Sequence, residues 1–366
     1  MRREPAKLWL DCDPGHDDAM AIILAGHNRL VNLIGVSTVA GNQTVAKVTQ
    51  NALDIVHAAG LPLIEVVAGL GKPLLRHSAI LCPEIHGDSG LDGPEGGPLL
   101  PKSPLKANPG KAVLIMFEAI QEHYMQKPEG EKIRLVCIGP LSNAAILFTL
   151  YPEVIPMVEV VLMGGCLGVG NTGPVMEFNI QTDPEAAKVV FECGVKLTMI
   201  PLEVTHTVLA TPEVLRAVAG ISENDTRDET NGDLHSSQNM TPSADCAHIA
   251  SRARTLFRKA MVHLLLFFAE TYRTEFEFPH PPLHDPCAVA YVIAPEIFKV
   301  RDMRVDIEVC SEVSAGQTVC DRWNSSKRSP NCSVAMEVDV NSFWRLMQEA
   351  IAAADAVSPL NNLATL

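Results

Sequence analysis

Residues 8–21 read LWLDCDPGHDDAMA and hold a short apolar run, an acidic turn and the start of a second apolar segment. Leu8 to Leu10 predict a buried strand. Asp17 and Asp18 precede an apolar segment that runs to Leu24, and acids in this position favour a helix start because they face the positive end of the helix dipole. The stretch therefore predicts a strand, a tight turn and a helix, which is the first unit of an α/β fold.

The strand-then-helix order of this unit repeats along the chain. Further strands are expected at 33–39, 63–68, 133–138, 158–163 and 195–200, and helices at 44–59, 111–123, 140–150 and 184–193. The alternation predicts an open, mostly parallel, doubly wound Rossmann-like sheet with helices on both faces. Alternating valines at 304–310 and 333–340 predict a small antiparallel hairpin as a C-terminal addition, followed by a closing helix at 343–354.

No internal repeat interrupts this order, so we expect one domain over residues 1–366. Two segments depart from the pattern. Residues 76–109 are rich in Gly and Pro and predict a flexible loop that forms a lid or rim. Residues 221–247 are polar and poor in aliphatic side chains, which is typical of a mobile insertion.

The composition excludes several classes of partner. The net charge is −14, and Lys and Arg are scattered rather than gathered in the basic stripe that nucleic-acid binding needs. No apolar run reaches the roughly 20 residues of a membrane span, and the short polar stretch 1–7 does not fit a signal peptide. The ten cysteines form no CxxC pair and indicate reduced thiols. We therefore expect a soluble cytoplasmic protein with a neutral or cationic small-molecule ligand.

The acidic turn itself presents a problem of charge. Residues 11–18 hold four aspartates, which repel one another strongly unless protons or a cation compensate. Pro14 and Gly15 fix a turn that folds these acids together. Oxygen ligands without a His/Cys set favour a hard cation, Ca²⁺ or Mg²⁺, over zinc. A helix cap with favourable first-turn acids explains one of the aspartates but not all four.

Other candidates for ligand contact lie at the edge where α/β proteins bind ligands, beyond the carboxyl ends of the strands. Asn42 follows the second strand and Met163 ends a later one, while His284 and Asp285 precede an apolar run at 287–294. Each has a structural alternative. Asn42 could cap the next helix, Met163 could belong to the core, and His284 could serve only to orient Asp285.

The stretch DCDPGHDDAMA at 11–21 closely resembles the signature of inosine–uridine nucleoside hydrolases. Further matching blocks occur in the family's order, at 40–44 (AGNQT), 86–93 (HGDSGLDG), 163–165 (MGG), 177–179 (EFN) and 284–286 (HDP). The resemblance spans residues 8 to about 295. It implies Ca²⁺-dependent hydrolysis of the N-glycosidic bond of uridine- or inosine-type ribonucleosides to ribose and free base, in nucleoside salvage or catabolism. It also implies a homodimer or homotetramer.

The resemblance also assigns roles to single residues. The implied Ca²⁺ ligands are Asp13, Asp18, Asp285 and the backbone carbonyl of Ile138. Asp13 would in addition deprotonate the attacking water, which is sensible because a divalent cation lowers the pKa of water. The residues implied to hold ribose are Asp17, Asn42 and Asn179 at the ring hydroxyls, with Asn171 and Glu177 on the 5′ side. Asp11 would support this group from behind.

The departing base must gain a proton, and His284 is the candidate acid because imidazole titrates near neutral pH. His16 and His86 are rivals for that role, and His86 lies on the predicted loop. Phe268 and Tyr272 lie one helical turn apart and resemble the family's base-stacking positions, where Tyr272 could also relay a proton. The alternative for this pair is an amphipathic helix that packs on the core.

Two other functions compete with hydrolysis. Asp11-x-Asp13 after a first strand is also found in haloacid-dehalogenase-like phosphatases, but Pro14-Gly15 followed by two more acids does not fit that motif. A catalytically silent nucleoside sensor on the same fold is the second alternative, although the intact Asp13 and His284 favour turnover. The sequence leaves the preference between purines and pyrimidines open.

Overall fold

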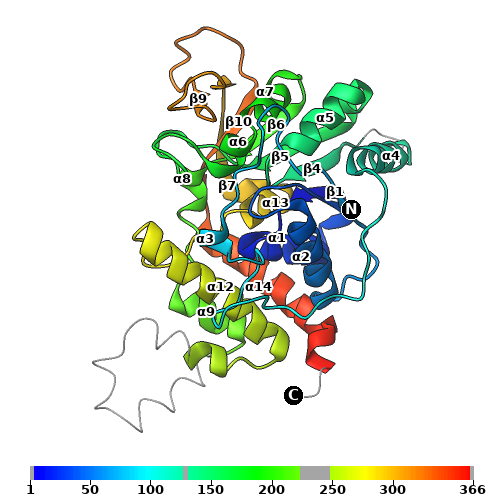
Figure 1. Cartoon of the computed structure of the whole chain (residues 1–366), viewed down its shortest axis with the longest axis vertical. Helices are drawn as coiled ribbons and strands as arrows, with labels where there is room; N and C mark the ends of the chain where they lie inside the picture. Colours follow the sequence, from blue (N-terminus) through cyan, green and yellow to red (C-terminus); the bar gives the residue numbers. More distant parts are fainter. Residues whose placement is uncertain (1–3, 127–130, 223–247, 363–366) are drawn as a thin grey trace.

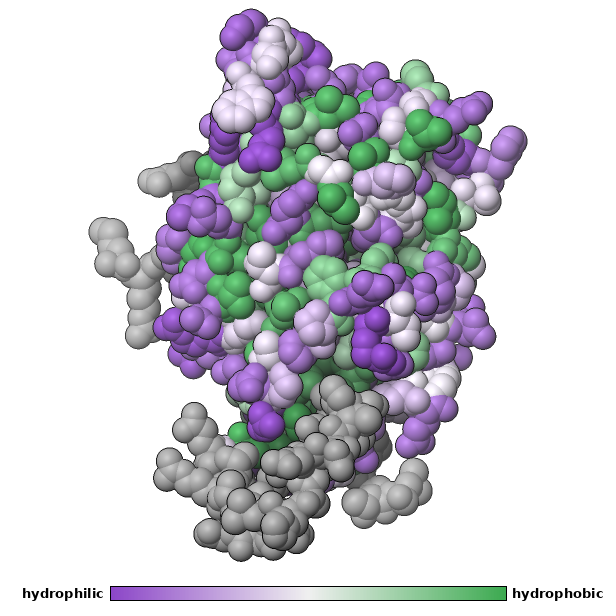
Figure 2. Space-filling model, turned by 90° about the vertical axis from the view of Figure 1, so that its left-hand side faces the viewer, coloured by the Kyte–Doolittle hydropathy of each residue, from purple (hydrophilic) through white to green (hydrophobic). Residues whose placement is uncertain are grey.

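The structure is a computed structural model of the 366-residue chain, described here over residues 4–126, 131–222 and 248–362. The insertion predicted at 221–247 lies outside the described residues from 223 onward. No helix in the described part of the chain is both long and apolar enough to cross a membrane. Figure 2 shows the side of the molecule that carries α8, α12 and β9, where hydrophobic residues are interspersed with hydrophilic ones.

The centre of the fold is an eight-stranded sheet in the order β3-β2-β1-β4-β5-β6-β10-β7. Its strands are β1 (Ala6–Cys12), β2 (Val31–Thr38), β3 (Val66–Ala68), β4 (Ile133–Cys137), β5 (Val158–Met163), β6 (Lys196–Ile200), β7 (Phe298–Met303) and β10 (Cys332–Val338). All neighbours are parallel except β7 and β10. The strand order reverses its direction between β1 and β4, which confirms the predicted doubly wound sheet.

Helices cover both faces of this sheet (Figure 1). They are α1 (His16–His27), α2 (Val45–Ala58), α3 (Pro83–His86), α4 (Ala112–Met125), α5 (Ser142–Leu150), α6 (Phe178–Thr182), α7 (Pro184–Glu192), α8 (Leu202–Thr205), α9 (Pro212–Ala219), α12 (Leu256–Glu275), α13 (Pro286–Ile293) and α14 (Val340–Val357), with short 3₁₀ turns at Pro152–Met157, Pro295–Ile297 and Pro359–Asn362. Alternate side chains of β1 enter two separate cores. Leu8 and Leu10 pack with α1, α13 and α14, whereas Trp9 packs with α4, α5 and α7.

The predicted C-terminal hairpin is wrong in its pairing. Strand β10 pairs antiparallel with β7, not with 304–310, and it also joins the main sheet parallel to β6. The segment after β7 forms β8 (Val305–Ile307) instead, which pairs with β9 (Thr318–Cys320) in a separate two-stranded sheet. Alternation along a strand determines which side chains share a face, but it does not determine which strand lies alongside.

The Gly- and Pro-rich segment 76–109 is held to the body of the protein at several points. It contains α3, it buries His86 and Asp92, and Asn108 forms a parallel bridge with Val67 of β3. The flexibility expected for segment 76–109 remains a prediction. The nine cysteines among the described residues are all free, as expected for reduced thiols.

Candidate functional site

The predicted site residues meet at the carboxyl ends of the central strands. Asp13 follows β1, Asn42 follows β2, Ile138 follows β4 and Met163 ends β5. The neighbouring strands β1 and β4 mark the point where the strand order reverses, and this is the crevice in which doubly wound sheets bind ligands.

A cavity of about 320 Å³ opens at this edge. Every residue that the sequence predicted for substrate binding lines it: Asp17, Asn42, His86, Met163, Asn171, Glu177, Asn179, Phe268 and Tyr272. His284, Asp285 and Ile138 line it as well. Residues that sequence reasoning missed also contribute to the wall, namely Cys82, Glu84, Ile85, Thr172, Phe178, Glu275 and Phe276.

The acidic turn folds around Asp18. Its carboxylate accepts hydrogen bonds from the backbone N–H groups of Asp13 (3.1 Å) and Gly15 (2.9 Å), which fixes the turn at the N-terminus of α1. Asp11 lies behind the turn and accepts from the Ser37 hydroxyl (2.5 Å) and the Asn143 amide (2.7 Å). This position agrees with a supporting role for Asp11.

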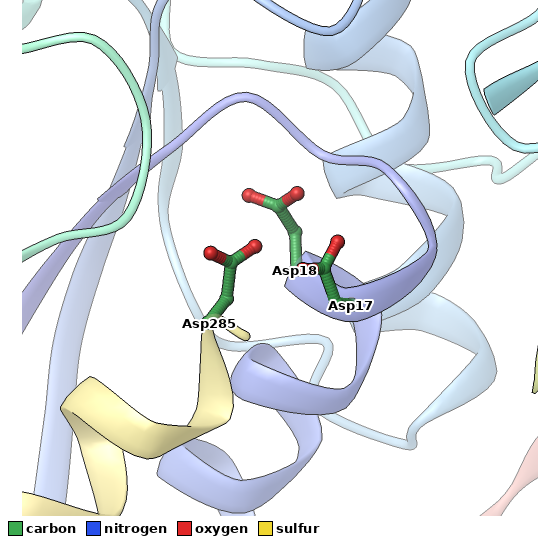
Figure 3. A group of neighbouring side chains, drawn as sticks. All are labelled: Asp17, Asp18 and Asp285. Atoms are coloured by element: carbon green, nitrogen blue, oxygen red, sulfur yellow. The ribbon is translucent and has the colours of Figure 1, made fainter. Parts of the chain in front are cut away.

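Three carboxylates come within reach of a single cation. Oxygens of Asp17 and Asp18 at the start of α1, and of Asp285 at the start of α13, lie within 4.8 Å of one another, and Figure 3 shows Asp18 and Asp285 pointing toward each other. Burial raises the pKa of Asp17 to about 7 and that of Asp18 to about 6, and it raises the pKa of Asp285 well above its usual range. This group contains Asp17 in place of the predicted Asp13.

Asp13 lies next to this group and is held tightly. Its Oδ2 accepts from the backbone N–H of Asn42 (2.7 Å), while its buried Oδ1 has no hydrogen-bond partner among the described residues. The carboxylate is packed between Gly41 and Gly139, where a β-carbon would overlap its oxygens. Burial, and then the charge of Asp18, raises the pKa of Asp13 well above its usual range. An unpartnered buried oxygen of this kind needs a proton, a water or a cation.

This packing gives a first testable prediction. A Gly41→Ala substitution should displace the Asp13 carboxylate, because the added methyl group overlaps Oδ2. We expect turnover to fall by roughly 100-fold, the order of loss that a misplacement of about 1 Å can cause. Steady-state assays would measure it. Gly168→Ala is the matched control, since a β-carbon at Gly168 meets nothing within 4 Å. Equal activity of Gly41→Ala and Gly168→Ala would contradict the claim that activity depends on the position of the Asp13 carboxylate.

Two of the residues predicted to hold ribose hydroxyls, Asn42 and Asn179, are fixed by hydrogen bonds of their amides. The Asn42 amide donates to the Asp13 carbonyl (3.1 Å) and to Asp18 (3.2 Å), and Cys82 donates to its oxygen (3.7 Å). The Asn179 amide donates to the carbonyls of Ile138 (2.9 Å) and Met163 (3.1 Å).

Glu177 and Asn171 are fixed by hydrogen bonds as well. The Glu177 carboxylate caps α6, where it accepts from the backbone N–H groups of Gly165, Asn179 and Ile180. Asn171 accepts from the N–H of Phe178 at 3.0 Å. Both residues line the cavity, so their predicted contact with the 5′ side of ribose stays compatible with the structure.

A group of stacked rings contributes to the cavity wall through His86 and Phe268. His16 stacks on Phe267 with ring centroids 4.7 Å apart, and His86 stacks on Phe268 at 5.6 Å. The two histidines contact each other through their Nδ1 atoms at 3.1 Å. Burial lowers the pKa of His16 to about 4 and that of His86 well below its usual value, so both are neutral at neutral pH.

His284 is bonded through both ring nitrogens. Its Nδ1 lies 2.7 Å from the Thr205 hydroxyl and its Nε2 lies 2.6 Å from the Tyr272 hydroxyl. Burial, and then the neighbouring His206, lowers the pKa of His284 well below its usual value, whereas burial raises the pKa of Tyr272. The imidazole is therefore neutral at neutral pH and the phenol keeps its proton. No motif in the sequence pointed to Thr205, which is 79 residues from His284.

Comparison with known proteins identifies the family and several relatives of this chain. The model of the family described as inosine-uridine preferring nucleoside hydrolase matches residues 8–345. A probable ribonucleoside hydrolase from Dictyostelium discoideum is 42% identical over 96% of this chain and 96% of its own length. A pyrimidine-specific ribonucleoside hydrolase from Escherichia coli is 34% identical over 95% and 97%. The solved purine-preferring ribonucleoside hydrolase from Gardnerella vaginalis superposes with a TM-score of 0.77 at 27% identity, over 96% and 99%.

Proposed function

Since this chain belongs to the inosine-uridine preferring nucleoside hydrolase family, we propose that it hydrolyses uridine- or inosine-type ribonucleosides to ribose and free base with Ca²⁺ in its site. The observation that carries the proposal is the meeting of Asp17 and Asp285, two amides and the Tyr272–His284 pair in one cavity. Membership of this family excludes the phosphatase alternative. The homo-oligomer and the cytoplasmic location remain predictions.

The donor set fits a hard cation. The clustered ligand atoms of Asp17, Asp18 and Asp285 are all carboxylate oxygens. Asp13 is joined to Asp18 through its backbone N–H, and its own Oδ1 has no hydrogen-bond partner among the described residues. Asp18 and Asp285 would hold Ca²⁺, together with Asp13 and the Ile138 carbonyl as the resemblance implies. When bound, the ion would supply positive charge that lowers the pKa of water and offsets the repulsion among these acids.

Side chains of the protein would have separate roles around the sugar. Asp13 would accept the proton of the attacking water through its free Oδ1, while the Asn42 N–H holds the other oxygen in place. Asp17, Asn42 and Asn179 would hold the ribose hydroxyls. Cleavage of an N-ribosidic bond passes through an oxocarbenium-like state, and the carboxylates beside the ring stabilise its positive charge.

The charge of the cavity distinguishes nucleosides from nucleotides. Five of its described lining residues are acids, namely Asp17, Glu84, Glu177, Glu275 and Asp285, and none of those described is Lys or Arg. We expect kcat/KM for uridine 5′-monophosphate to be lower than for uridine by about 100-fold or more, because like charges brought together cost several kcal/mol. Measuring ribose or ribose phosphate released from each compound checks this, and equal rates would contradict it.

A panel of uridine, cytidine, inosine, adenosine and guanosine tests the proposed function. We expect ribose and free base in equal amounts from at least uridine or inosine. Of the three relatives named above, the one from Escherichia coli is pyrimidine-specific and the one from Gardnerella vaginalis is purine-preferring, so the panel also establishes the base preference. Saturable binding of these nucleosides without release of ribose would show a sensor and contradict the proposal.

A further inference from the structure

A buried chain of three side chains leads from α8 to the cavity. The Thr205 hydroxyl lies 2.7 Å from Nδ1 of His284, and Nε2 of His284 lies 2.6 Å from the Tyr272 hydroxyl. Thr205 is completely buried at the end of α8 and does not line the cavity, whereas Tyr272 does. The hydrogen-bonded series therefore begins with the buried Thr205 hydroxyl, continues through the His284 imidazole and ends with the Tyr272 phenol at the cavity wall.

The distances decide where the protons lie. The Thr205 hydroxyl has one hydrogen and two acceptors in reach, Nδ1 of His284 at 2.7 Å and the Leu202 carbonyl at 3.4 Å. A hydroxyl hydrogen bond is normally 2.5–3.0 Å long, and the Leu202 carbonyl already accepts from the N–H of His206 at 2.8 Å. The Thr205 hydroxyl therefore donates to Nδ1.

The hydrogen bond from Thr205 to His284 determines the direction of the hydrogen bond between His284 and Tyr272. An imidazole that accepts at Nδ1 carries its hydrogen on Nε2. Nε2–H then donates to the Tyr272 oxygen, so the phenol hydrogen cannot point toward His284. It points away from the imidazole, and Tyr272 is one of the residues that line the cavity.

We propose that Thr205 is a positioning residue for leaving-group protonation, because it holds His284 in the tautomer that turns the Tyr272 O–H toward the departing base. This inference rests on the proposed function. As the C1′–N bond breaks, its electron pair goes to the base nitrogen, which takes the phenol proton. Water forms the new C1′–O bond and loses a proton to Asp13. Nε2–H stabilises the tyrosinate until Tyr272 regains a proton from solvent and Asp13 releases one, so that nucleoside and water become ribose and base.

The test compares two leaving groups. One substrate is the nucleoside that the wild type hydrolyses fastest, and the other is 4-nitrophenyl β-D-riboside, whose nitrophenolate departs without a proton. For Thr205→Val, which keeps the shape but loses the hydroxyl, we expect kcat on the nucleoside to fall by about 10- to 100-fold, with the nitrophenyl riboside hydrolysed at nearly the wild-type rate. Thr205→Ser should restore nucleoside hydrolysis.

Thr207 provides the matched control. It lies two residues away, and its one hydroxyl hydrogen is donated to the Val204 carbonyl at 2.7 Å. We therefore expect Thr207→Val to hydrolyse both substrates as the wild type does. Equal losses on both substrates in Thr205→Val, or no loss on the nucleoside, would overturn the inference. If that variant fails to fold, Tyr272→Phe is measured on the same two substrates, and an equal loss on both would also overturn it. A wild type that cleaves neither substrate would instead contradict the proposed function.

Discussion

Asp13→Asn is expected to lower kcat for ribonucleoside hydrolysis by about 100- to 10,000-fold, the usual contribution of a general base. The side chain keeps its shape, but an amide cannot accept the proton of the attacking water at the position of the free Oδ1. The Asn42 N–H can still donate to the remaining oxygen. We therefore expect a smaller change in KM than in kcat, because the ribose contacts of Asn42 and Asn179 are retained.

A control variant separates this chemical effect from a general loss of folding. Asp302→Asn makes the same substitution at an exposed position on β7 and should leave the kinetics unchanged. The melting temperature of Asp13→Asn should stay near or above the wild-type value in the absence of cation, since the substitution removes a buried acid. Near-wild-type kcat in Asp13→Asn would contradict the role assigned to Asp13.

Calcium is expected to stabilise the protein, and more so at alkaline than at acidic pH. Without a cation, burial holds the pKa of Asp17 at about 7 and that of Asp18 at about 6, above the unfolded value of 3.8. The folded state thus binds more protons, so these groups favour folding below about pH 4 and that contribution is lost as the pH rises toward 7. Calcium requires the deprotonated carboxylates, so its binding should offset this loss mainly at higher pH.

Thermal unfolding with EDTA or with Ca²⁺ measures this effect. At a Ca²⁺ concentration about 100 times the Kd, binding contributes about 2.7 kcal/mol, which corresponds to a rise in Tm of about 3.5 °C for a chain of 366 residues. We expect this rise at about pH 8 and a smaller one at about pH 5. Asp285→Asn should lose most of the rise, and Asp302→Asn should keep it. A rise in Tm that is the same at both pH values and is retained in Asp285→Asn would show that the ion binds elsewhere.

The sequence predicted the strands of the sheet well where the residue pattern within one segment is enough to identify the strand. The run 8–21 specifies a strand, a turn and a helix through local patterning, and β5 has the predicted bounds 158–163. The partner of β10 could not be predicted in the same way. Both 298–303 and 304–310 are able to form a strand, and the choice depends on packing between segments that are distant in the sequence.

The same contrast between local patterns and long-range contacts applies to the site. Motifs identified most of the residues that line the cavity, because a tight turn of aspartates and the blocks around Asn42, Asn179 and His284 are each local. Their mutual arrangement was not local. The sequence could not show that Asp17 lies with Asp18 and Asp285, or that Thr205 contacts His284, since these contacts join α1 to α13 and α8 to the turn before α13.

Ribose release by metal-free and Ca²⁺-loaded enzyme tests the central claim most directly, namely that the carboxylate group at Asp18 and Asp285 holds a divalent cation needed for hydrolysis. The wild type is stripped with EDTA, its metal content is verified, and release of ribose from uridine and inosine is followed before and after Ca²⁺ is added. We predict that release stops in the metal-free protein and returns with Ca²⁺, and that Asp285→Asn does not recover. Full turnover by a verified metal-free wild type would contradict the account.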